Sequence, residues 1–173
     1  MIPAGKGGEN MATEIRFPVV LDDSQAAKDL MDLQRKIIRT MDALNKSSQT
    51  KLDLGKQLKE AEVNADATAA KVKALRNQLA EYRALVRNPG SDPLKNAMAV
   101  MGQKQVQEQL SEAEKQLESQ TSTVADLKAK YDEVVSTIKQ QTAELKEAER
   151  EAGQLEKQVS MHKKAAMIES AIK

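Results

Sequence analysis

The stretch Arg87-Asn88-Pro89-Gly90-Ser91-Asp92-Pro93 is the one place in the middle of the chain where a helix cannot continue. Pro89 lacks a backbone N–H and disfavours helical angles at the residue before it. Gly90 allows a left-handed turn. Because long helix-patterned sequence lies on both sides, we expect a turn over 88–93 that folds two antiparallel arms together.

The first arm, expected as one helix over 22–87, opens with an acidic capping signal at 22–24. Apolar residues then recur in an unbroken 3–4 spacing, which is typical of a coiled-coil seam rather than an ordinary amphipathic helix. The first set of positions is apolar at eight of nine places and the second at five of eight. The sets are Leu30, Ile37, Leu44, Lys51, Leu58, Ala65, Val72, Leu79 and Val86, and Leu33, Thr40, Ser47, Leu54, Ala61, Thr68, Leu75 and Tyr82.

The second arm, expected as a coiled-coil helix over 94–173, carries the same pattern. Ser91 or Asp92 can cap it, with Pro93 in its first turn, where a missing N–H costs nothing. Its first set is apolar at nine of ten places and its second at six of nine. The sets are Gln103, Leu110, Leu117, Val124, Tyr131, Ile138, Leu145, Ala152, Val159 and Ala166, and Val106, Ala113, Gln120, Leu127, Val134, Gln141, Ala148, Leu155 and His162.

The two arms predict an all-α fold, a long antiparallel helical hairpin. One register fills the seam by placing small residues opposite larger ones, and a one-heptad slip is the alternative. At about 1.5 Å per residue the shorter arm would be on the order of 95 Å long, a shape with almost no concave surface for a small molecule. The register pairs Leu30 with Leu155, Leu58 with Leu127, Leu75 with Leu110 and Leu79 with Val106.

The residues before the first arm form two further segments. Residues 1–12 are Gly-rich without a period, and we expect a disordered leader. Lys6 to Asn10 can be encoded by a bacterial ribosome-binding site, which gives the hypothesis that Met11 is the true start; an ordinary flexible leader is the alternative. Alternating apolar residues predict a short β-strand over 13–21. Because a single strand is not stable, its partner would come from another chain or from sequence beyond this one.

The composition excludes several protein classes. The 173 residues carry a net charge of +1, 31% charged and 2% aromatic side chains, and neither Trp nor Cys. One Phe and two Tyr cannot fill a three-dimensional core, and without Cys there are no disulfides or thiolate metal sites. No apolar run approaches the roughly 20 residues that cross a bilayer. The near-neutral charge argues against general nucleic-acid or acidic-membrane binding by the whole chain.

The sequence contains no recognisable catalytic, cofactor-binding or metal site. His162 is the only histidine and has no second His or Cys to help it hold a metal. Carboxylate pairs such as Glu108 with Glu112, or Glu147 with Glu151, lie on helix faces with no desolvated cleft to shift their pKa. We therefore expect no enzyme activity and no cofactor.

Basic residues gather around the turn. From Lys71 to Gln105, seven basic and two acidic residues give +5, and the chain total of +1 leaves −4 for the rest. Such a tip can meet phosphate or an acidic protein surface, although Tyr82 alone could stack on a base. The alternative is a solvated charged end. The candidate partner-binding residues are Arg76, Arg83, Arg87 and Lys95.

Polar residues interrupt the seams. Lys51, Gln120 and Gln141 could fix the register or the choice of partner at a cost in stability. The alternative is a loosely packed middle, which the small residues of 64–70 favour.

The strand-to-helix junction EIRFPVVLDDSQAAKDL, residues 14–30, resembles the opening of phage tail tape measure proteins. In that family a short alternating strand, a turn of the form D-x-S-Q-A and a Leu/Lys-rich coiled coil follow one another; 33–37 and 51–58 are typical of the last part. Tape measure proteins are usually several times longer, with apolar segments further on. The resemblance therefore implies the N-terminal part of such a protein or a truncated copy.

The resemblance implies a structural role in the virion tail, which is assembled in the cytoplasm of the bacterial host. There, an extended helical chain occupies the tail tube and sets how far the tube grows. The implied partners are copies of the chain, tail tube subunits and tail assembly chaperones. The alternative function is a bacterial cytoplasmic coiled-coil adaptor that presents its basic tip to a partner.

Overall fold

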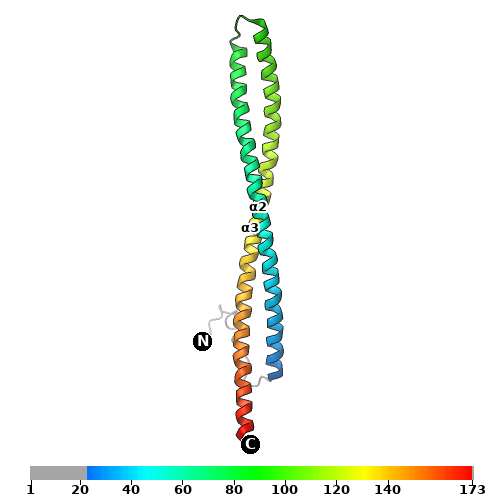
Figure 1. The fold of residues 1–173 in the computed structure, drawn as a ribbon, viewed down its shortest axis with the longest axis vertical. Coiled ribbons are helices and arrows are strands. Elements are labelled where there is room, and N and C mark those ends of the chain that lie inside the picture. The colour runs from blue at the N-terminus through cyan, green and yellow to red at the C-terminus, as the bar shows by residue number, and fades with distance from the viewer. Residues whose placement is uncertain (1–22, 173) are drawn as a thin grey trace, which may run out of the picture. The chain divides into compact units, whose positions relative to one another are not determined.

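The computed structural model describes residues 23–172, and they form two long helices joined by a turn (Figure 1). Helix α2 (Asp23–Arg87) has 65 residues and helix α3 (Pro93–Ile172) has 80. The two helices pack against each other, which confirms the predicted all-helical hairpin. The expected leader over 1–12 and strand over 13–21 lie outside the described residues.

The turn ends where Asp92 caps α3. The Leu94 N–H donates to Oδ1 of Asp92 at 3.0 Å, and the Asn96 N–H donates to the Asp92 carbonyl at 3.1 Å. An N-cap residue makes these two contacts with the first turn of a helix. Asp92 rather than Ser91 is thus the cap, and α3 begins at Pro93, one residue before the expected start.

Replacing Asp92 with alanine is expected to lower the free energy of unfolding by about 1 kcal/mol, because the Leu94 N–H loses its acceptor. Asp92→Asn should restore most of the loss, since asparagine caps as well as aspartate. The measurement is urea unfolding followed by circular dichroism at 222 nm. Ser91→Ala is the matched control, and an equal loss in that variant would show that the cap is misassigned.

The structure divides into two units, and in each of them the predicted seam positions are shielded from solvent. One unit combines 23–48 of α2 with 136–172 of α3, and the other is the continuous segment 49–135. Every predicted seam position of α2 is buried or half-buried, and so is every one of α3 except Ala166. Burial of one apolar stripe per helix is the driving force that a heptad pattern supplies.

The unit formed by 49–135 contains a continuous apolar core. Its buried members are Val72, Leu75, Leu79, Val106, Leu110 and Ala113, with Tyr82 and Leu117 packed against them. Two of the predicted pairs, Leu75 with Leu110 and Leu79 with Val106, therefore lie in one cluster. Val72, Leu79 and Ala113 are each less than 5% exposed, so their methyl groups are almost entirely removed from water.

Contacts between the helices decide the register. A methyl group at Gly102 would meet the Tyr82 ring, and one at Gly55 would lie 3.6 Å from Cε2 of Tyr131. Each contact is within one residue of the predicted pairing. A one-heptad slip would move these groups about 10 Å apart along the helices. The structure thus adopts the small-against-large register.

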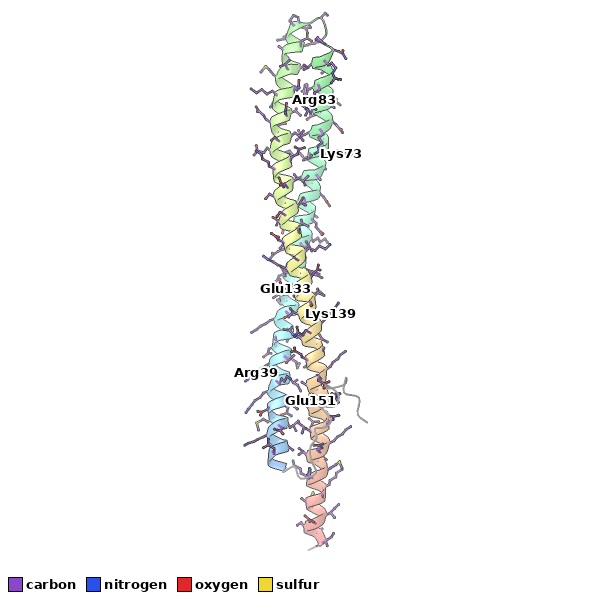
Figure 2. The ribbon with its side chains drawn as sticks, turned by 180° about the vertical axis from the view of Figure 1, so that it is seen from behind. Arg39, Lys73, Arg83, Glu133, Lys139 and Glu151 are labelled. Atoms are coloured by element: carbon purple, nitrogen blue, oxygen red, sulfur yellow. The ribbon has the colours of Figure 1, made fainter. Side chains whose placement is uncertain are left out.

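The other unit has a core of smaller side chains. Ala26, Ala148, Ala152 and Leu155 are its buried residues. On its surface the guanidinium of Arg150 donates to Glu147 at 2.6 Å. This hydrogen bond, the Arg150 charge and the Lys36 charge from α2 lower the pKa of Glu147 below its usual value, although partial burial acts the other way. Arg39 on α2 and Glu151 on α3 belong to the same unit (Figure 2).

The polar seam residues are half-buried, as their positions predict. The Oε1 atoms of Gln120 and Gln141 are buried and accept no hydrogen bond from any protein group in residues 23–172. A buried acceptor without a partner costs roughly 1–3 kcal/mol. The Oε1 atoms of these two amides therefore do not fix the register through hydrogen bonds to described protein groups.

Candidate functional site

The closed end of the hairpin, where α2 ends and α3 begins, contains a cavity of about 570 Å³. The sequence predicted almost no concave surface, and this expectation was wrong here. Two small residues, Gly90 and Ala99, form part of its wall. The lining residues are Tyr82, Leu85, Gly90, Ser91, Asp92, Lys95, Asn96, Met98 and Ala99.

The side chain of Asn96 ties the turn back to the second helix. The Gly90 N–H donates to Oδ1 of Asn96 at 3.1 Å, and Nδ2 of Asn96 donates to the Gly90 carbonyl at 2.8 Å. Gly90 does not adopt the left-handed conformation that we expected of it. The two hydrogen bonds from the Asn96 side chain, rather than a left-handed glycine, hold the turn in shape. They also fix one edge of the cavity.

Apolar side chains stand exposed on both walls of the cavity. Leu85 from α2 is 56% exposed and Met98 from α3 is 63% exposed. Tyr82, half-buried and packed on the apolar core, joins them from α2. The combination is a hollow with an aromatic residue and two aliphatic residues that no described part of the chain covers.

The four predicted cations differ in their surroundings. Arg76 forms an ion pair across the hairpin, with Nη2 at 2.8 Å and Nε at 3.2 Å from Oε1 of Glu114. Lys95 lines the cavity, whereas Arg83 and Arg87 do not. Helical periodicity places Arg83, seven residues after Arg76, on the opposite flank of the seam from Leu85.

Figure 2 shows Arg83 and Lys73 on α2 in the half of the helix nearer the turn. The ion pair of Arg76 with Glu114 could not be foreseen while the register was open, because the partners are 38 residues apart in sequence. Lys95 is the one predicted residue that belongs to the cavity. Leu85, Met98 and Asn96 were not predicted as site residues, since an exposed apolar side chain or an asparagine carries no signal by itself.

The described residues offer no second kind of site. Within 23–172 no group of three or more His, Asp or Glu side chains could hold a metal ion. His162 is half-buried at its seam position near the end of α3. Neither α2 nor α3 contains a stretch that is apolar and long enough to span a bilayer.

Comparison of the chain with protein-family models, with curated proteins and with solved structures finds no match. The resemblance to tape measure proteins therefore rests on the sequence alone. Residues 14–22 of the junction that carries it lie outside the described part of the chain, and residues 23–30 form the first two turns of α2.

Proposed function

We propose that this chain is a structural protein, the N-terminal part of a phage tail tape measure protein that helps to set the length of the tail tube. The observation that carries the proposal is how the chain uses its apolar residues. Almost all buried positions belong to one 3–4 seam that pairs α2 with α3. A chain whose apolar residues serve mainly to pair two long helices is suited to set the length of an assembly.

The spacing role has a simple physical basis. Each heptad of helix adds about 10 Å of rise. In a hairpin a heptad added to one arm must be matched by a heptad in the other, or the seam loses its register. Length is thus encoded in pairs of heptads, and no catalytic residue is required. The proposed partners are copies of the chain, tail tube subunits and assembly chaperones, and the proposed location is the virion tail.

The test is a matched deletion in the complete phage gene. Residues 58–64 and 121–127 are opposite heptads in the observed register, so removing both keeps every remaining seam pair. Tails seen by electron microscopy should shorten by about 10 Å if the hairpin persists in the tail, and by about 21 Å if the chain unfolds into one extended helix. Averaging over many tails resolves these increments, and several such deletions should add.

Two controls accompany the deletion. Exchanging the exposed residues of the same heptads for alanine keeps the number of residues and should leave the tail length unchanged. Tails of normal length after two or more matched deletions would reject the ruler. If no tails form, the purified deletion variant is examined by itself. Retained helicity and a normal unfolding midpoint would then mean that the segment is needed for tail assembly rather than for setting tail length.

A second candidate function is a cytoplasmic adaptor that presents the closed end of its hairpin to a partner protein. The cavity between Leu85 and Met98 favours it, because a pure spacer needs no hollow lined by exposed apolar groups. The candidates differ in location. Finding the chain in purified tails supports the role in setting tail length. Finding the chain in cells that produce no tail particles supports the adaptor.

A further inference from the structure

We propose that the cavity at the closed end binds an apolar side chain of a partner protein segment whose neighbouring residues are acidic. The site would give the adaptor candidate a defined partner chemistry, and it does not exclude the spacer role. The inference is independent of tail length, so its failure would leave the ruler test untouched.

The apolar part of the argument rests on where the exposed side chains lie. Leu85 and Met98 line opposite walls, and both expose more than half of their surface. Three more exposed apolar residues, Leu94, Val100 and Met101, lie within four residues of Met98 in the sequence, outside the cavity lining itself. Covering such groups is favourable, and exposed apolar clusters mark interaction sites. Methionine adapts its shape to different apolar partners.

The site is held in place before any partner arrives. Asn96 and Gly90 exchange two hydrogen bonds, and Asp92 caps the helix that carries Lys95 and Met98. A preformed hollow loses little conformational entropy on binding.

Charge selects the kind of segment. The end from Lys71 to Gln105 carries +5 with the Asp92 carboxylate already counted. That carboxylate accepts the Leu94 N–H but keeps its negative charge, so the attraction for an acidic segment comes from the surplus of basic residues around the cavity. Lys95 lines the cavity and forms no ion pair with any residue in 23–172. Arg83 and Arg87 add to the positive field that would steer an acidic segment to this end.

Nucleic acid fits the cavity less well than an acidic peptide does. Tyr82 is the only aromatic residue in the lining, and it is half-buried against the apolar core. Single-strand binding sites need exposed aromatic platforms for successive bases. An apolar hollow beside one ammonium group instead matches an aliphatic side chain with a carboxylate next to it.

The experiment uses the full chain with ¹³C-labelled methionine methyl groups. The probe is a synthetic twelve-residue peptide with one central leucine flanked by glutamates, added at low salt. The Met98 signal, identified with Met98→Leu, should shift and saturate, while the Met161 and Met167 signals at the far end of α3 should not. The same peptide with serine in place of leucine, or with lysines in place of glutamates, should bind at least about tenfold more weakly.

Matched variants separate the site from its surroundings. Lys95→Glu should weaken binding about tenfold, whereas Lys104→Glu, with the same change of charge at a position outside the cavity, should weaken it less than about threefold. Leu85→Ser should abolish the shift, and Leu52→Ser, equally exposed on the same helix, should not. Circular dichroism checks that each variant remains folded.

Four results would overturn the proposal. The first is a Met98 signal that does not change at a saturating concentration of the peptide, and the second is equally tight binding of the peptide with lysines in place of glutamates. The third is a Met98 shift that depends on the concentration of the protein when no peptide is present. The fourth is a Met98 shift with phosphatidylglycerol vesicles but not with the peptide. The third would assign the cavity to a second copy of the chain, and the fourth to an anionic membrane surface.

Discussion

Replacing Leu79 with alanine is expected to lower the free energy of unfolding by roughly 2–5 kcal/mol. Leu79 is 4% exposed and lies in the core cluster with Leu75 and Val106. Removing three carbon atoms there forfeits their transfer free energy and leaves a cavity between two helices. Few of the described side chains are buried at all, so the loss of one should lower the unfolding midpoint in urea steeply.

Leu85→Ala is the matched control, because it makes the same change on the same helix six residues away. Leu85 is 56% exposed, and its truncation should change the free energy of unfolding by no more than about 0.5 kcal/mol. Urea unfolding at 222 nm measures both variants. If Leu79→Ala proves too unstable to study, Leu79→Met should retain most of the stability, because it nearly conserves volume.

The comparison distinguishes a paired seam from two independent helices. A single solvated helix would respond to both truncations alike, because alanine is the better helix former at either position. Equal effects at Leu79 and Leu85 would therefore contradict the packing of α2 on α3. A large effect confined to Leu79 would place the stabilising free energy in the core of the 49–135 unit.

The burial pattern was predictable from the sequence because a 3–4 spacing gives each helix a single apolar stripe that must be buried. Leu75 and Leu110 were placed in the core by spacing alone, and the structure buries both. The register was not predictable in the same way, since a seven-residue slip satisfies the same spacing. It is decided by local fit, such as the Tyr82 ring over Gly102, which periodicity does not contain.

The candidate site was predictable only in part. Counting charges found the basic closed end and named Lys95, but it grouped that residue with Arg76, which the fold pairs with Glu114. Such pairing depends on which residues of the other helix lie opposite. The cavity was missed because it depends on which side chains meet at the turn. Among them are the small residues Gly90 and Ala99 and the Asn96 side chain that bonds to Gly90.

Replacing Gly102 with alanine is expected to lower the free energy of unfolding by about 1–2 kcal/mol, although alanine favours a helix by roughly 1 kcal/mol over glycine. The new methyl group would lie 2.6 Å from Cε1 and 2.7 Å from Cζ of Tyr82, closer than carbon atoms can approach. The Tyr82 ring must shift and lose part of its packing on the core, and the cavity beside it is the space into which it can move.

Gly153→Ala makes the same substitution in the same helix with the opposite expected sign. No atom lies within 4 Å of the position a methyl group would take at Gly153, so only the helix preference remains. Its free energy of unfolding should rise by about 0.5–1 kcal/mol. Thermal and urea unfolding of the two variants measure the difference directly.

A double-mutant cycle identifies Tyr82 as the cause. In a Tyr82→Ala background the obstructing ring is gone, and Gly102→Ala should then stabilise the chain by about 0.5–1 kcal/mol, as at Gly153. A change of sign for one substitution, controlled by a residue twenty positions away on the other helix, requires that the two positions touch. If Gly102→Ala destabilises equally in both backgrounds, the ring does not lie over Gly102, and the register that places Lys95 and Leu85 around one cavity must be abandoned.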